Sequence, residues 1–208
     1  MKDTTVESIG LFIDGGYYAK INEALQKKCS TSIDMTKLMD YIRWVISKMC
    51  GKNQTQCHIT ESHYFRGRYW ADEAVEKDLL LEERMFEDTL IENDVIFHYK
   101  HLRKIFDESK GYKRVMEKGI DVWFSLEAYE LATIRHFDYV VLITGDADHE
   151  MVIRKLKALK IPVILLTWDL EIGGTGTSPM LVEEACKHIE ISRLDEVLQK
   201  SLCKEIKQ

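Results

Sequence analysis

The stretch from residue 139 to residue 168 constrains the fold of this chain more than any other. Its residues 140–143 (VVLI) form a continuous apolar run rich in β-branched side chains, which is typical of a strand buried on both faces. An acidic turn at 144–148 (TGDAD) follows, after which apolar residues recur with helical spacing until a second apolar run at 161–166. A strand–helix–strand unit with two buried strands predicts an α/β fold with a parallel sheet and a right-handed crossover.

The remaining sequence alternates between strand and helix patterns in the same way. We expect further strands at 9–13, 56–66 and 95–102, and helices at 17–28, from Asp34 or Thr36 to about 50, at 72–92 and at 121–136. We also expect a polar loop at 103–112, a flexible segment at 170–178, and short helices with a strand at 188–191 in the tail after Pro179. No repeat or linker divides the 208 residues, so we expect one domain.

Composition excludes several classes of protein. The chain is 45% hydrophobic and 31% charged, as globular proteins are, and none of its apolar runs approaches the ~20 residues that span a bilayer. The five cysteines form no CxxC pair, so we expect neither a disulfide framework nor a zinc site, but a reduced cytoplasmic protein. The net charge of −6 gives no general attraction to nucleic acids, so such contacts require local basic patches.

Four aspartates stand at expected strand ends or helix starts. Asp14 follows the strand at 9–13, Asp146 and Asp148 follow the strand at 140–143, and Asp121 begins a helix. Parallel sheets bind ligands outside the carboxyl ends of their strands, and carboxylates that meet there repel one another unless a cation lies between them. Mg²⁺ or Mn²⁺ bound by oxygen would meet that need, and such an ion can polarise a phosphate and activate water. Turn formation and helix capping are the alternative roles of Asp14 and Asp121, but the Asp-x-Asp pair after an apolar strand favours a site.

Three segments of the chain resemble the NYN domain family, in particular its LabA-like members, a branch of the PIN-like nuclease superfamily. They are LFIDGGYY (11–18), KGIDVWFSLEAYELA (118–132) and VVLITGDADHEMVIRKLKALKIPVILL (140–166), and their order and spacing also fit. The resemblance implies a three-layer α/β/α sandwich around a mostly parallel sheet, PIN-like and Rossmann-like. It implies a single domain over residues 1–208, with a short carboxyl-terminal extension from about 179. Characterised relatives are metal-dependent ribonucleases, while many LabA-like members have no assigned reaction.

The resemblance also assigns roles to individual residues. The catalytic and metal-binding positions would be Asp14, Asp121, Asp146 and Asp148, with Mg²⁺ or Mn²⁺ as cofactor. Glu127 stands where many relatives have aspartate; it lies nearly two helical turns after Asp121, so it would act through water or in an auxiliary role. Two further auxiliary roles follow from the residues themselves: the Thr144 hydroxyl could orient a carboxylate or water or cap the turn, and Lys118, three residues before Asp121, could neutralise a phosphate.

Four residues are candidates for substrate binding: Tyr17, Arg66, Arg68 and His149. Tyr17 replaces an asparagine of many relatives and could lie over substrate, whereas His149 could bind phosphate or begin its helix. The two arginines lie in HYFRGRYW (63–70), where they could hold phosphates while Tyr69 or Trp70 stacks on a base. Alternatively, this segment is a strand end whose aromatic residues complete the core.

Two further segments receive weaker interpretations. KHLRK (100–104), with Lys110, Lys113 and Arg114, forms a second basic region that is either a solvated face or a guide for RNA. GGTGT (173–177) lacks the lysine of a phosphate-binding P-loop, so we interpret it as a mobile loop at the rim of the sheet.

The leading hypothesis is a metal-dependent endoribonuclease that hydrolyses RNA phosphodiester bonds. The main alternative is an NYN-like module that binds RNA or protein with little or no catalysis, which the net negative charge favours and the intact acidic set disfavours. A third hypothesis is another metal-dependent phosphohydrolase, but a haloacid-dehalogenase-like enzyme needs DxD after its first strand, where this chain has Asp14-Gly15-Gly16. The expected partner is RNA, with no membrane association, and a homodimer is left open.

Overall fold

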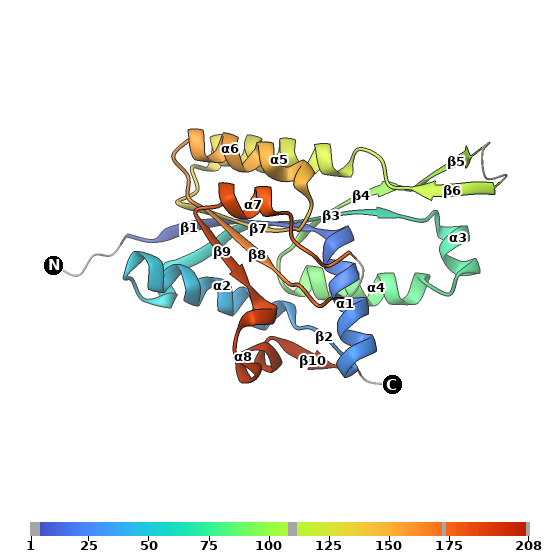
Figure 1. Cartoon of the computed structure of the whole chain (residues 1–208), viewed down its shortest axis with the longest axis horizontal. Coiled ribbons are helices and arrows are strands. Elements are labelled where there is room, and N and C mark those ends of the chain that lie inside the picture. Colours follow the sequence, from blue (N-terminus) through green and yellow to red (C-terminus); the bar gives the residue numbers. More distant parts are fainter. Residues whose placement is uncertain (1–4, 108–111, 172–173, 207–208) are drawn as a thin grey trace.

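The computed structural model describes residues 5–107, 112–171 and 174–206. At its centre lies a six-stranded sheet in the order β4-β3-β1-β7-β8-β9, in which every neighbouring pair is parallel (Figure 1). Its strands are β1 (Glu7–Asp14), β3 (Cys57–Arg68), β4 (Ile96–His101), β7 (Tyr139–Ile143), β8 (Val163–Thr167) and β9 (Lys187–Glu190). The long apolar runs at 140–143 and 161–166 thus become the inner strands β7 and β8, as their continuous hydrophobicity predicts.

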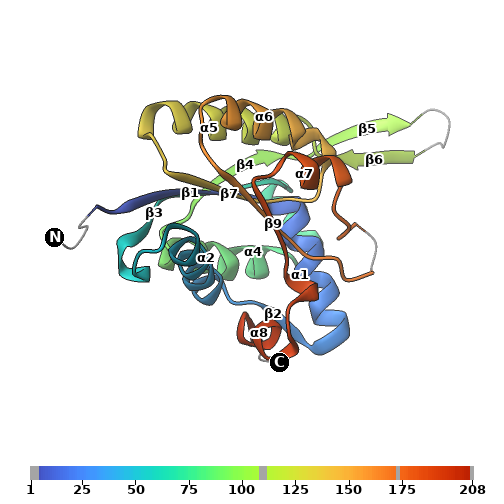
Figure 2. The same cartoon turned by 60° about the vertical axis from the view of Figure 1, so that its left-hand side comes forward.

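Helices cover both faces of the sheet (Figures 1 and 2). One face carries α1 (Gly15–Cys29), α2 (Met35–Cys50) and α4 (Leu80–Glu92), and the other carries α5 (Ile120–Arg135), α6 (Glu150–Ala158) and α7 (Pro179–Glu184). Alternation along β1 serves the two layers, since Leu11 and Ile13 pack with the α1–α2 layer and Phe12 packs with the α5–α6 layer. This arrangement confirms the three-layer α/β/α sandwich expected from the sequence.

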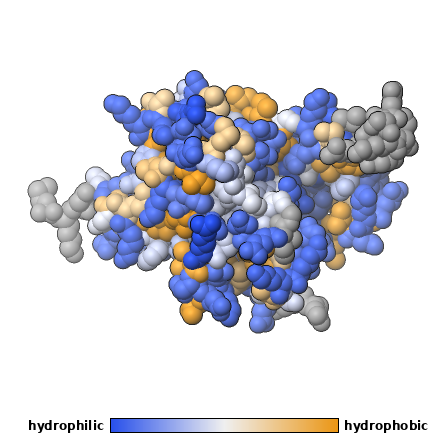
Figure 3. Space-filling view, viewed as in Figure 1, coloured by the Kyte–Doolittle hydropathy of each residue, from blue (hydrophilic) through white to orange (hydrophobic). Residues whose placement is uncertain are grey.

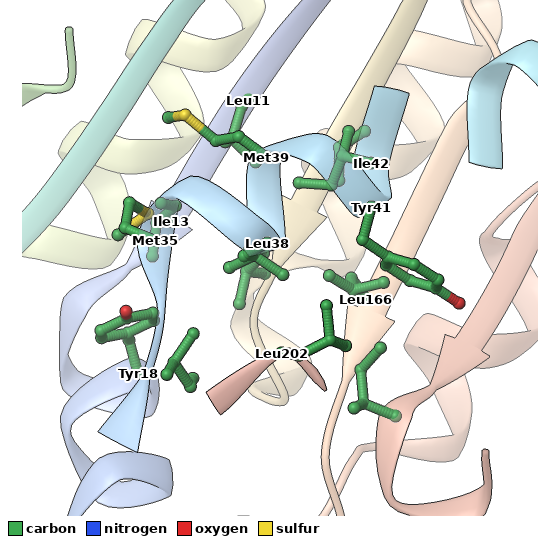
Figure 4. Close-up of a cluster of buried hydrophobic side chains, with 14 of the residues drawn as sticks. Leu11, Ile13, Tyr18, Met35, Leu38, Met39, Tyr41, Ile42, Leu166 and Leu202 are labelled. Atoms are coloured by element: carbon green, nitrogen blue, oxygen red, sulfur yellow. The ribbon is translucent and has the colours of Figure 1, made fainter. Parts of the chain in front are cut away.

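The packing of α2 illustrates how the core is made (Figure 4). The Asp34 carboxylate caps the helix by accepting the Lys37 N–H at 3.2 Å. Buried side chains at helical spacing then face the sheet, where Leu38 and Ile42 belong to the same cluster as Leu11 and Leu166 of two different strands. The cluster is therefore continuous from helix to sheet and fixes α2 against the strands.

The order of the strands determines where a ligand site can form. From β1 the chain adds β3 and β4 on one side, and then returns to place β7, β8 and β9 on the other side. Helices lie on opposite faces of these two halves, so the carboxyl ends of β1 and β7 border the crevice at which ligands bind in such sheets. Ile13 of β1 is paired with Ile143 of β7, which sets Asp14 next to Thr144 at the rim.

Several elements differ from the sequence-based expectations. The hairpin of β5 (Arg103–Asp107) and β6 (Tyr112–Met116) replaces most of the loop expected at 103–112 and projects from the sheet (Figure 2). The expected helix at 72–92 is divided into α3 (Ala71–Glu76) and α4, because Asp78 adopts a left-handed conformation with φ of 55°.

Short elements complete the chain. β2 (Thr31–Ile33) pairs antiparallel with β10 (Cys203–Glu205). The other short elements are the 3-10 helices η1 (Gln54–Gln56), η2 (Ala147–His149) and η3 (Ile191–Arg193), and the helix α8 (Glu196–Ser201). Among the described helices, none combines the length and apolar character needed to cross a membrane. The face in Figure 3 is predominantly hydrophilic, with small separate hydrophobic areas.

Candidate active site

Asp14 occupies the centre of the site, at the junction of β1 and α1. Its side chain caps α1, since Oδ1 accepts the Tyr17 N–H at 3.0 Å, and Oδ2 accepts the Thr144 hydroxyl at 3.0 Å. Nε2 of His149 lies 3.8 Å from Oδ2. Burial alone would raise the pKa of Asp14, but His149, the Tyr17 N–H and the Thr144 hydroxyl together lower it. Asp14 is therefore held as a carboxylate.

The turn after β7 brings a second aspartate to this place. Thr144 is fully buried, and its hydroxyl oxygen also accepts the Asp146 N–H at 3.2 Å. Asp146 then caps η2 by accepting the Asp148 N–H at 3.0 Å. Asp146 and Asp148 are exposed at the rim, and Asp148 is tied to the turn through its backbone. One threonine thus orients Asp14 and the start of the acidic turn together.

Gly145 is required in this turn because the chain is crowded there. A Cβ at this position would lie 2.5 Å from the Gly176 carbonyl oxygen and 2.7 Å from Cε2 of Tyr17. Both distances are shorter than van der Waals contact allows, so a larger residue would displace the turn that carries Asp146.

Two further acids come from the segment between the end of β6 and the first turn of α5. Asp121 lies in its first turn, and its pKa is raised by burial and by the charges of Asp14 and Asp146, although His149 opposes the shift. The pKa of Glu117 is raised by burial and by the charges of Asp14 and Asp121. Asp14, Glu117, Asp121 and Asp146 therefore form one set of interacting charges, which we call the acidic cluster.

Sequence reasoning missed Glu117. The Gly67 N–H at the end of β3 donates to its carboxylate, and a Cβ on Gly16 would lie 3.5 Å from its Oε2. Glu117 reaches the site because the chain returns from the β5–β6 hairpin past the end of β3. No local sequence pattern predicts that return. The available signal was its place one residue before the KGID segment that carries Asp121.

The chemistry of the acidic cluster fits a hard divalent cation. Its donors are carboxylate oxygens, and their mutual repulsion would fall if a cation bound between them. Within the described residues, no three His, Cys, Asp or Glu side chains are close enough to hold one ion together. Mg²⁺ usually binds through one or two carboxylates and keeps several waters, so the cluster suits it in that open form.

Some residues predicted at the site serve other parts of the structure. Glu127 accepts a hydrogen bond from Nε1 of Trp123 at 3.1 Å, and its charge acts on His63 and His98. Glu127 thus interacts with a histidine pair on β3 and β4. None of these contacts joins it to the four aspartates, so its predicted auxiliary role stays a prediction. Lys118 is exposed, directly after Glu117 in the sequence.

Tyr17 and His149 are both buried, so neither side chain is exposed to a substrate, and His149 has its alternative role as the residue that precedes α6 at its amino end. The Tyr17 hydroxyl accepts the Trp168 N–H at 2.9 Å and lies 2.7 and 3.0 Å from the Trp168 and Thr175 carbonyl oxygens. Burial raises the pKa of Tyr17 to about 12, so it remains a phenol that fixes the loop after β8. His149 packs against Phe124 with 4.3 Å between ring centroids, and faces Asp14 from inside the protein.

The two arginines and their aromatic neighbours divide between core and surface. Tyr64 and Phe65 are core residues, as the alternative interpretation of this segment proposes. Arg66 is partly buried beside the Tyr64 hydroxyl. Arg68 forms ion pairs with Glu83 and Glu87, at 3.4 and 3.1 Å, so its charge is largely compensated within the protein.

The two remaining segments are only partly described. In the second basic region, Lys104 pairs with Glu73, whereas Lys110 lies outside the described residues. In the glycine-rich segment, Gly173 lies outside them as well, and Thr175 is fully buried, with its hydroxyl accepting the Leu170 N–H at 3.2 Å.

Comparisons with known proteins find a distant curated relative and weak likenesses to solved structures. The chain is 23% identical over 163 residues to "Low amplitude and bright protein LabA" of Synechococcus elongatus, which covers 77% of this chain and 74% of that protein. A Listeria monocytogenes crystal structure, described as a UDP-N-acetylglucosamine 2-epimerase, superposes with a TM-score of 0.42 and 9% identity over 95% of this chain. This chain spans only 42% of that protein, and the likeness carries no inference.

The family comparison covers most of the chain. Residues 8–192 match the model of the NYN domain, whose family comprises PIN-like nucleases. The matched range begins within β1 and ends within η3, so it includes every strand of the central sheet and all four members of the acidic cluster. The protein therefore belongs to the NYN domain family.

Proposed function

We propose that this protein is a metal-dependent endoribonuclease that hydrolyses RNA phosphodiester bonds at the acidic cluster. The observation that carries the proposal is that acids from three separate parts of the chain interact at the crevice between β1 and β7, where the charge of Asp14 contributes to the raised pKa of both Glu117 and Asp121. Such mutual repulsion costs stability, and functional sites are where proteins commonly retain it. Membership in a family of PIN-like nucleases supports the same reaction.

The residues of the acidic cluster would have different roles in the reaction, because their environments shift their pKa values in different directions. Asp14 has a lowered pKa and is held from both sides, so it remains an oriented carboxylate that can bind a cation together with Asp146. Glu117 and Asp121 have raised pKa values, which suits groups that accept a proton from an attacking water. When bound, Mg²⁺ or Mn²⁺ would neutralise the acids and the phosphate and make water more acidic. Lys118, exposed beside Glu117, can contact a phosphate of the strand.

One observation favours a second candidate, an NYN-like module that binds RNA or protein with little catalysis. The described residues lack a group of three carboxylates that could jointly hold an ion, so metal binding would depend on water and substrate as further ligands. If the substrate does not supply them, the same fold would bind a partner without turnover.

An RNA cleavage assay separates the two candidates. Single-stranded and structured RNAs are incubated with Mg²⁺, with Mn²⁺ or with EDTA, for wild type, Asp146→Asn and the matched control Asp88→Asn, in which an exposed aspartate of α4 is changed. We expect metal-dependent cleavage by wild type and by the control, and loss of cleavage with retained RNA binding in Asp146→Asn. If wild type binds RNA but cuts none with any cation, and Asp146→Asn binds identically, the binding module replaces the nuclease.

A further inference from the structure

A pocket of about 660 Å³ lies beside the acidic cluster, on the face of the sheet covered by α1 and α4. Gly16 and Glu117 line it, and both also adjoin Asp14, so the pocket and the cluster share a wall. The volume falls within the ~300–1,000 Å³ typical of small-molecule sites. A strand that places a phosphate at the cluster could therefore place a neighbouring group in the pocket.

Aromatic rings and basic groups line this pocket together. The rings include those of Tyr69, Phe86 and Tyr99, and the basic groups are Lys20, Arg66 and Arg68. Tyr69 is partly exposed and carries the Lys77 ammonium over its ring at 5.2 Å, which adds to the positive character of that wall. Aromatic faces beside cations are the features on which proteins stack unpaired nucleobases.

The charges of the lining favour a base over a phosphate. Four glutamates line the pocket, namely Glu23, Glu82, Glu83 and Glu117, against three basic residues, of which Arg68 is already paired with Glu83. A phosphate would be repelled by this excess of acids. The exocyclic amino groups of a base are donors that carboxylates accept.

We propose that this pocket receives one unpaired nucleobase of the RNA strand, next to the phosphodiester bond held at the acidic cluster. The identity of the ligand as RNA rests on the proposed function, whereas the expectation that a base binds comes from the residues that line the pocket. It implies that the protein selects RNA in which at least one nucleotide at the cleavage position can leave the base stack. A free nucleoside monophosphate offers the same base and is the competing source of the ligand.

The test measures base-dependent binding without cleavage. Fluorescent single-stranded RNAs, each with one abasic nucleotide at a different position, are titrated in EDTA and followed by anisotropy. Stacking on one aromatic residue contributes ~1–3 kcal/mol, so we expect one abasic position to weaken wild-type binding roughly 5- to 150-fold. Tyr69→Leu should lose a similar factor on intact RNA and become insensitive to that abasic position, while Tyr69→Phe should behave as wild type.

Trp44→Ala provides the matched control. Trp44 is an exposed aromatic residue of α2 that stacks on Tyr41 with 5.7 Å between ring centroids and does not line the pocket. It should keep the wild-type response to the abasic series. Thermal melts of all variants verify that they are folded. Equal responses of wild type and Tyr69→Leu would overturn the inference, as would displacement of RNA by nucleoside monophosphates without any abasic effect.

The assay also distinguishes failure of the pocket from failure of the proposed function. Metal-dependent cleavage with no base dependence would refute the base-binding role of the pocket and support the nuclease function. Base-dependent binding without cleavage under any divalent cation would support the base-binding role and refute the nuclease function.

Discussion

The Thr144 hydroxyl donates a hydrogen bond to Oδ2 of Asp14 at 3.0 Å, and thereby joins the carboxyl ends of β7 and β1. The same oxygen accepts the Asp146 N–H, so this single side chain adjusts two members of the acidic cluster to each other. Three predictions follow from this arrangement and from the charges around it, and a fourth concerns a pair of histidines on β3 and β4.

Thr144→Val should weaken both stability and activity. Valine keeps the shape of threonine but leaves one oxygen of a largely buried carboxylate without its donor, which costs about 1–3 kcal/mol. For a chain of this length each kcal/mol lowers Tm by roughly 2–4 °C. Thr144→Ser, which keeps the hydroxyl, serves as the control in the same thermal melts and RNA assays. A Val variant as stable and active as Ser would show that the hydrogen bond is dispensable.

Divalent cations should stabilise the protein through the acidic cluster. A ligand that binds only the folded state stabilises it by RT ln(1 + [L]/Kd), roughly 2.7 kcal/mol at a hundredfold excess over Kd. We expect Mn²⁺ to raise Tm in wild type, EDTA to reverse the rise, and Asp146→Asn to show a smaller rise. Identical shifts in wild type and variant would place the cation elsewhere on the protein.

Glu117→Gln should separate stability from activity. Removing this charge relieves repulsion with Asp14 and Asp121, so stability without metal should be unchanged or higher. Loss of a supporting group near a metal typically costs on the order of 10- to 100-fold in affinity or rate. RNA cleavage and Mn²⁺ titration measure this loss, with Glu130→Gln, at an exposed position of α5, as control. If Glu117→Gln cleaves RNA at the wild-type rate, the residue lies outside the site.

The histidine pair on β3 and β4 predicts loss of stability in acid. Nδ1 of His63 lies 2.8 Å from Nε2 of His98, and burial lowers the pKa of both imidazoles, with Glu61 and Glu127 opposing the shift at His63. The unfolded chain therefore takes up protons first as pH falls below about 6.5, and stability drops from there toward the folded pKa.

Urea denaturation between pH 8 and pH 5 measures this dependence. Each histidine contributes a slope of at most ~1.4 kcal/mol per pH unit. His63→Phe retains a ring beside Phe12 and should flatten the profile, whereas His58→Gln, at an exposed position, should leave it unchanged. A wild-type profile that is flat over this range would contradict the prediction.

The sequence predicts the centre of this fold better than its edges. The strands β7 and β8 and the helix between them follow directly from continuous apolar runs and helical spacing. The break between α3 and α4 and the β5–β6 hairpin were missed, because they depend on a left-handed residue and on pairing between polar segments. Secondary structure is hard to predict from sequence patterns in segments where hydrophobic periodicity is weak.

The same division applies to the site. Strand ends and the order of the parallel sheet suffice to expect Asp14 near the turn that carries Asp146. Tyr17 could not be placed, since its hydroxyl contacts Trp168, which is 151 residues away in the sequence. The contact of Glu127 with Trp123 could not be predicted either, because its distance along α5 argues only against direct contact with the acids and says nothing of which side chain it meets instead.

The pairing of β1 with β7 also determines when the site can exist. Asp14 and Thr144 are separated by 130 residues, so their contact closes a long loop and forms late compared with local structure. During synthesis, a chain that has emerged only as far as α5 holds Asp14, Glu117 and Asp121 but lacks the turn that completes the cluster. Insertion of β7 beside β1 is therefore the folding step that completes the acidic cluster, and under the proposed function no activity is expected before it.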